Sequence, residues 1–251
     1  MLPGLMRALL PLLLLAVPAL AQGDKPVFDL PKPDPRKAPA EQDTAEDAEL
    51  QRTLQRLSGW PNERARRAAE RLIVMKERSK PYVEAVLTSG DPRAASLKPG
   101  AAYVIGRIGD TSHCLTLLLV AAEKAQQRHA STFLEAAWRL DEEAAVAEAF
   151  RFFHLGETTL RNEAVKFVLD RVTKANLPQI EDLLDKSKAE RSFTREIGLR
   201  FLDRLVQTDQ VSWAEVGPRF YGALGDEWPQ VWSRVMRMVA SRTDAEKIAS
   251  L

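Results

Sequence analysis

The chain has 251 residues, of which 36 are Lys or Arg and 35 are Asp or Glu. This balance argues against a general nucleic-acid binder, because non-specific affinity for nucleic acid depends on an excess of basic side chains that neutralise phosphates. The chain also has one cysteine, Cys114, so an intramolecular disulfide is excluded and packing must hold the fold.

Residues 1–21 have the pattern of a secretory signal peptide. Arg7 supplies a positive charge, a leucine-rich apolar run follows at 8–17, and the segment ends in Ala19-Leu20-Ala21 before Gln22. The run is shorter than the roughly 20 apolar residues of a transmembrane helix, so an uncleaved membrane anchor is the less favoured alternative. We predict an exported protein, periplasmic or secreted, that begins at Gln22 and keeps no stable membrane span after cleavage.

Residues 22–43 have the composition of a proline-rich tether. The segment contains five prolines among charged residues, and its only sizeable apolar side chains are Val27, Phe28 and Leu30. Such a segment cannot bury enough apolar surface to offset the entropy of ordering, so we expect an extended, disordered linker. The remaining region, 44–251, is long enough for one core or one array of repeats.

From residue 44 onward, apolar side chains recur at helical spacing and no segment alternates as a strand does. Between residues 62 and 78, for example, steps of three and four place alanines, a leucine and a methionine on one face and arginines on another. Ser212 and Thr243 each precede a glutamate by three residues, a pattern that typically begins a helix. We therefore predict an all-α fold of about ten to thirteen helices with no sheet.

Small or aliphatic doublets recur in this region and indicate a repeat. They occur in the first helix of each expected pair, where small residues allow neighbouring helices to approach closely. The spacing between successive doublets is 28 to 38 residues, within the range of helical solenoids. Since one helix pair cannot bury its apolar face alone, the pairs are expected to stack. The doublets are Ala68-Ala69, Ala101-Ala102, Ala136-Ala137, Ala164-Val165, Ile197-Gly198 and Val235-Met236.

One unit carries a family resemblance. Its first helix ends in Ile105-Gly106-Arg107-Ile108-Gly109-Asp110, and a leucine-rich second segment follows from Cys114 to Val120. This arrangement resembles a HEAT repeat, an armadillo-type unit of two antiparallel helices. The next unit keeps the aspartate of this turn, in Arg139-Leu140-Asp141. The last three units lack a segment like 105–110, so a TPR-like or unclassified helical array stays open as an alternative for them. The resemblance implies an α-solenoid of about five to six units over residues 44–251.

The sequence shows no recognisable catalytic, cofactor or metal site. His113 and Cys114 are adjacent, so on a helix their side chains diverge by about 100° and do not pair as zinc ligands. The acidic residues within 181–185 are typical of a solvated helix face. Nucleophile-elbow, phosphate-loop and zinc-protease patterns are absent from the sequence. We predict that the protein is not an enzyme and takes no cofactor or metal. Cys114 is expected to pack in a helix or, alternatively, to link a dimer through a disulfide.

The C-terminal third is enriched in tryptophan and arginine. Trp213, Trp228 and Trp232 lie within twenty residues, and arginines follow closely. Tryptophan and arginine dominate binding hot spots, so Trp228, Trp232, Arg234 and Arg237 are the candidate partner-binding residues. The alternative is that the tryptophans seal the end of the stack, as terminal repeats must.

These features predict an exported, non-catalytic HEAT-like scaffold that mediates protein–protein interaction, with a protein partner and no nucleic acid. HEAT-like proteins serve mainly as binding scaffolds, and a minority act on cofactors or nucleic acids. Two alternatives stay open. One is an enzymatic or cofactor-handling protein, which rests on fold analogy alone. The other is a structural subunit of an envelope assembly, recruited through Cys114 or through the aromatic end.

Overall fold

The computed structural model describes residues 44–154, 158–185 and 192–249. Over these ranges the chain forms twelve α-helices, connected by turns and short 3-10 helices, and it has no strand. The predicted all-α class, the number of helices and the lack of a sheet are confirmed for this part of the chain. The predicted signal peptide (1–21) and tether (22–43) lie outside the described residues.

Most helices are short, and the last is the longest. In chain order they are α1 (Thr44–Gln55), α2 (Glu63–Met75), α3 (Lys80–Thr88), α4 (Lys98–Ile108), α5 (His113–Ala122), α6 (Ala130–Leu140), α7 (Glu142–Ala149), α8 (Thr158–Leu169), α9 (Leu177–Leu184), α10 (Ser192–Gln207), α11 (Trp213–Ala223) and α12 (Pro229–Ala249).

Side-chain caps explain where several helices begin. Asn62 accepts a hydrogen bond from the backbone N–H of Ala65, and Ser212 accepts one from Glu215, so the predicted start at Ser212 is confirmed. The predicted start at Thr243 is wrong, because α12 runs through this position to Ala249. A capping pattern begins a helix only where the preceding backbone leaves the helical conformation, and no glycine or proline interrupts α12 before Thr243.

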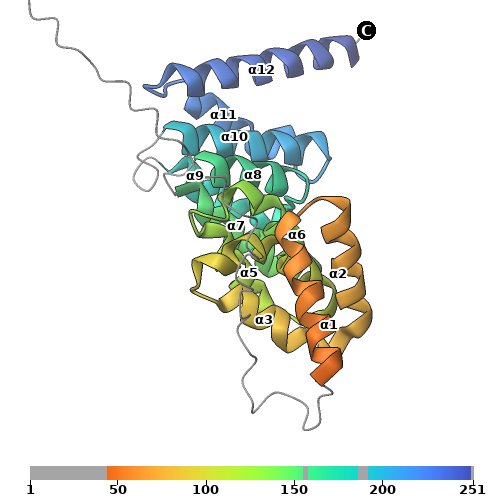
Figure 1. Cartoon of the computed structure of the whole chain (residues 1–251). Coiled ribbons are helices and arrows are strands. Elements are labelled where there is room, and N and C mark those ends of the chain that lie inside the picture. The colour runs from red at the N-terminus through yellow and green to blue at the C-terminus, as the bar shows by residue number, and fades with distance from the viewer. Residues whose placement is uncertain (1–43, 155–157, 186–191, 250–251) are drawn as a thin grey trace, which may run out of the picture.

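Helices that alternate along the chain pack on one another. α2 packs on α4, α4 on α6, α6 on α8, α8 on α10 and α10 on α12, while α3, α5 and α7 also contact one another in order. In Figure 1 the helices follow one another from α1, α2 and α3 at one end to α12, which lies across the other end. Within the run from α2 to α8, and from α8 through α10 to α12, each helix therefore contacts the helix two positions further along the chain.

Small residues set the closest of these contacts. At Gly106 the backbone of α4 approaches α6 so closely that an added Cβ would lie 2.8 Å from the Cα of Ala136. The alanines of the doublets Ala101-Ala102 and Ala136-Ala137 are also buried. The glycine in the phrase 105–110 is thus required by helix packing, since any larger side chain would push α4 and α6 apart.

One continuous apolar core runs from Leu50 in α1 to Met238 in α12. Near its middle, Phe150 and Phe153 meet Phe201 of α10, with ring centroids 5.3 to 5.5 Å apart. Phe153 and Phe201 are fully buried. This aromatic cluster joins the two halves of the described region, because the first two rings follow α7 and the third lies on α10.

Candidate functional site

The last helix leaves a line of large apolar side chains exposed. Trp228, Trp232 and Met236 are spaced four residues apart, and 43, 41 and 53 % of their surfaces are exposed. This spacing places them along one side of α12 and of the residue that precedes it. Another side of the same helix is buried through Val231 and Val235. We name Trp228, Trp232 and Met236 the α12 stripe.

Two residues from the end of α11 add to the exposed apolar surface. Tyr221 and Leu224 are 53 and 37 % exposed. Figure 1 shows α11 beside α12 at this end of the molecule. The aromatic enrichment that pointed to this end from the sequence includes Tyr221, whereas Leu224 was not predicted. Met236 was expected at a close helix contact as part of the doublet Val235-Met236, but only Val235 is buried and Met236 is exposed. The step of four residues from Trp228 to Met236 is the signal that leads to Met236.

A buried ion pair holds the start of α12. Arg195 of α10 and Asp226 are both almost fully buried. The Arg195 Nε donates to Asp226 Oδ2 at 2.8 Å, and Nη2 donates to Oδ1 at 3.1 Å. Asp226 Oδ1 also accepts the backbone N–H of Trp228 at 3.0 Å. This carboxylate therefore connects α10 directly to the first residue of the α12 stripe.

The two predicted arginines have different surroundings. Arg234 donates to Glu196 Oε1 of α10 from Nη2 at 2.6 Å and from Nε at 3.1 Å, so it fastens α12 to α10. Arg237 is exposed, and its Nε donates to the Ser233 carbonyl in the preceding turn. At about 100° per residue, Arg234 lies on the other side of the helix from Trp232. Of the four predicted residues, Trp228 and Trp232 lie in the stripe, whereas the arginines lie outside it.

The alternative prediction is that Trp213, Trp228 and Trp232 pack against the last helices and close the end of the stack. Of the three, Trp213 packs in this way. Its ring stacks on Phe220 with centroids 4.9 Å apart and meets Tyr221 edge-on at 6.2 Å. Phe220 is fully buried. One tryptophan therefore packs within α11 against the core, while the two that follow keep more than a third of their surface exposed.

Cys114 is buried in the core of α5, with 3 % of its surface exposed. Burial is the main cause that raises the pKa of the Cys114 thiol to about 11, and Asp141 and Glu148 add to it. A protonated, buried thiol is a poor nucleophile, so this position weighs against the disulfide-linked dimer considered from the sequence.

We expect Cys114 to be unreactive in the folded protein. At pH 8 the thiol, with its raised pKa, stays protonated and shielded, so its reaction with Ellman's reagent should be more than about 100-fold slower than in denaturant. Stopped-flow absorbance with and without guanidinium measures this ratio. Equal rates in the two conditions would show that the thiol is accessible and would restore the disulfide-linked dimer as a candidate.

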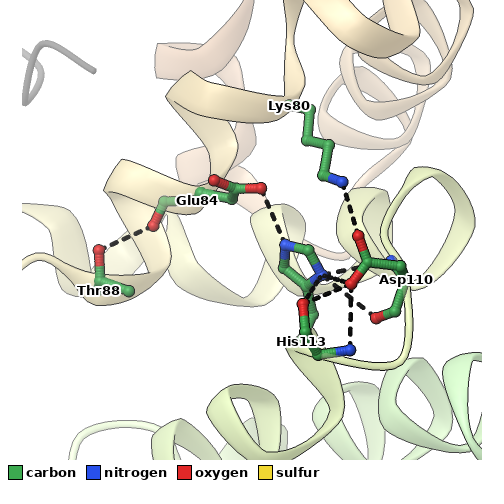
Figure 2. A network of polar contacts seen from close by, with 6 residues as sticks. Lys80, Glu84, Thr88, Asp110 and His113 are labelled. Carbon is green, nitrogen blue, oxygen red and sulfur yellow. Dashed lines mark hydrogen bonds and ion pairs between the residues drawn. The ribbon is translucent and has the colours of Figure 1, made fainter. Parts of the chain in front are cut away.

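A polar network, drawn in Figure 2, surrounds the turn of the HEAT-like phrase. Lys80 Nζ donates to Asp110 Oδ2 at 2.9 Å, and His113 Nε2 lies 2.8 Å from Glu84 Oε1. Hydrogen bonds from Ser112 and then from Lys80 hold the pKa of Asp110 well below its usual range. The turn aspartate thus fastens the start of α5 to α3, which is a structural role.

The same network resembles a catalytic arrangement only superficially. The Ser112 hydroxyl lies 3.4 Å from His113 Nδ1, but it donates its hydrogen bond to Asp110 Oδ1, which also lies 3.1 Å from His113 Nδ1. The hydroxyl proton is therefore directed to the carboxylate and not to the imidazole, unlike that of an activated serine nucleophile. Among the described residues, no group of three or more His, Cys, Asp or Glu side chains is arranged to hold a metal ion. The acidic segment predicted as a solvated face contains Glu181, which pairs with Arg219 of α11.

Comparison of the chain with protein-family models, with curated proteins and with solved structures finds no match. The HEAT-like resemblance therefore depends on the residues of the chain itself. No helix in the described ranges is long and apolar enough to cross a membrane. Over the residues that the structure describes, the fold is all-helical, and α11 and α12 carry an exposed apolar face.

Proposed function

We propose that this protein is an exported, non-catalytic HEAT-like α-solenoid that binds a partner protein through the α12 stripe. The observation that supports this most is the exposure of two tryptophans and a methionine in line on the terminal helix. Exposed apolar patches on soluble proteins mark interaction sites, and tryptophan is enriched among the residues that dominate binding free energy. The matching surface of the partner is therefore apolar.

The solenoid part of the proposal rests on the order of helix contacts. Alternate helices pack on one another from α2 to α12, and the alanine doublets are buried. Helix pairs in a solenoid bury their apolar faces against their neighbours. The surface formed by α11 and α12 carries exposed apolar side chains instead, which favours a surface that a partner covers.

The export part rests on the sequence. The signal-like pattern of residues 1–21 would direct the chain out of the cytoplasm, and the proline-rich segment 22–43 would then tether the helical body. The single cysteine fits this proposal, because Cys114 lies in the core and does not depend on the redox state of the compartment.

The non-catalytic part rests on where the perturbed titratable groups lie. Active sites bring groups with shifted pKa values together in a cleft. Here the shifted carboxyl of Asp110 lies in the turn before α5, and the shifted thiol of Cys114 lies in the core. The imidazole beside Asp110, that of His113, is held between Asp110 and Glu84, and the thiol of Cys114 is shielded in the core.

The substitution Met236→Glu tests the interface. The exposed position and the similar helix propensities of methionine and glutamate predict a change in the free energy of unfolding below about 0.5 kcal/mol. A carboxylate placed in an apolar contact would instead weaken partner binding by at least about 100-fold. Affinity capture of partner from the exported fraction, alongside thermal melts, measures both effects.

Val74→Glu is the matched control, because Val74 is also an exposed apolar residue and it lies on α2, at the other end of the described region. It should leave capture unchanged. If the Met236→Glu variant captured the partner as well as the unaltered chain does, the α12 stripe would be excluded as the binding surface. Loss of capture by Val74→Glu as well would indicate a general effect of charge.

A further inference from the structure

A second feature of the molecule lies far from the α12 stripe, in a cavity of about 280 Å³ between α4 and α6. Trp60, just before α2, and Tyr103 of α4 form an aromatic side, with ring centroids 4.6 Å apart. The floor includes Ala136, at the point where α4 and α6 come closest. The remaining lining residues are polar or charged: Arg107, Ser131, Thr132, Glu135 and Arg139.

Two arginines of this cavity form no salt bridge within the described ranges, although the charge of Glu70 acts on Arg107. Arg107 lies over the Tyr103 ring, 3.4 Å from its centroid, and donates to the Tyr103 carbonyl. Arg139 is exposed at the end of α6. Neither forms an ion pair with a residue in the described ranges. Their like charges face the same space, an arrangement that an anion placed between them would stabilise.

The acidic groups nearby are already engaged. Glu135 pairs with Arg171 of the next unit at 2.7 Å, and Glu70 accepts the hydroxyl hydrogen bond of Tyr103 at 2.8 Å. The lining itself contains two arginines against one glutamate, which gives a formal charge of +1. That charge matches a monoanion better than a dianion such as phosphate.

The other residues that line the cavity determine which chemical group can accompany the anion. Trp60 Nε1 donates to Thr132 Oγ1 at 3.4 Å, which leaves the Thr132 hydroxyl hydrogen available to donate. The Trp60 and Tyr103 rings, tilted by 45° to each other, form with Ala136 an apolar side of the cavity beside the arginines. An aromatic or aliphatic group can pack on this side while its carboxylate reaches the guanidinium groups.

We propose that this cavity binds a carboxylate that carries an adjacent apolar or aromatic group, with Arg107 and Arg139 as its anion-binding residues. In proteins such a carboxylate comes from a C-terminal apolar residue or from an acidic side chain beside one. The site is separate from the α12 stripe, so its presence does not depend on the proposed partner interface.

Isothermal titration of the purified full chain with three small probes tests the site. N-acetylphenylalanine supplies a C-terminal carboxylate, N-acetyl-aspartyl-phenylalaninamide supplies a side-chain carboxylate, and N-acetylphenylalaninamide has the ring without a charge. We expect at least one acid to bind with a Kd of about 1 mM or tighter, and the uncharged amide to bind at least about 10-fold more weakly. The tighter of the two acids identifies the carboxylate source.

Variants locate the binding. Arg107→Gln with Arg139→Gln should abolish measurable binding of the acid, whereas Arg151→Gln, an exposed arginine outside the cavity, should leave its Kd unchanged. The indole N–H resonance of Trp60, assigned through Trp60→Phe, should shift on titration of the unaltered protein. Circular dichroism confirms that each variant is folded.

Five results would overturn the proposal, the first four of which concern selectivity and location. These four are equal affinity for the acid and its amide, retained binding in the folded double-arginine variant, no shift of the Trp60 resonance, and inorganic phosphate binding as tightly as the acids. The last of the four would define a general anion site. No heat of binding for either acid up to about 10 mM, well above the expected Kd, would also contradict it.

Discussion

Replacing Asp226 by alanine is expected to lower the free energy of unfolding by about 3 to 5 kcal/mol, because it leaves a buried guanidinium without its carboxylate. Arg195 and Asp226 are 3 and 6 % exposed and share two hydrogen bonds. The same substitution removes the acceptor of the Trp228 backbone N–H. Urea denaturation, followed by circular dichroism, measures the change.

Two controls distinguish this effect from a general loss of charge at the α12 end. Glu227 lies 4.0 Å from Arg195 but its side chain is 76 % exposed, so Glu227→Ala should cost less than about 1 kcal/mol. Replacing both partners by apolar residues, Arg195→Met with Asp226→Leu, should recover part of the loss. A cost for Asp226→Ala as small as that for Glu227→Ala would contradict the buried pair.

Replacing Phe201 by alanine is expected to cost a similar amount, about 3 to 5 kcal/mol, through lost burial and the cavity that remains. The Phe201 ring is fully buried and contacts both Phe150 and Phe153. Because these rings come from either side of residues 155–157, the substitution should also weaken the coupling between the two halves of the described region. Urea denaturation monitored by circular dichroism gives the change in stability.

Phe201→Leu is the matched variant, since leucine keeps most of the apolar volume. Its cost should stay below about 1.5 kcal/mol if the site can repack around it. A cost for Phe201→Ala as small as the one expected for Phe201→Leu would show that the aromatic cluster tolerates a cavity. In that case the cluster would not be a principal source of stability.

Local patterns in the sequence account for most of the helices. The apolar spacing and the Ser212 cap are short-range signals, and the structure follows them. The predicted helix start at Thr243 is wrong because a capping residue needs a non-helical backbone, and residues 243–246 alone do not determine the conformation of the chain before them. The role of Gly106 depends on Ala136, thirty residues later, and only the fold shows that contact.

The candidate site was less predictable for the same reason. Tryptophan enrichment located the right end of the chain, but exposure depends on what packs against each ring. Arg234 was expected to face a partner, and its ion pair with Glu196 of α10 joins residues 38 apart in sequence. Arg195 was not singled out, since arginine is seldom buried without a specific partner. The cavity beside Trp60 likewise combines residues from α4 and α6.

Site-specific photo-crosslinking tests the central claim, that the α12 stripe contacts a partner protein. Trp232 is replaced by photoreactive benzoylphenylalanine, which keeps an aromatic group at the exposed position, and Val74 receives the same residue as the control. Irradiation of the exported fraction should yield one discrete crosslinked product from position 232 and none from position 74. A folded protein that gives no product from position 232, or the same products from both positions, would contradict the proposed function.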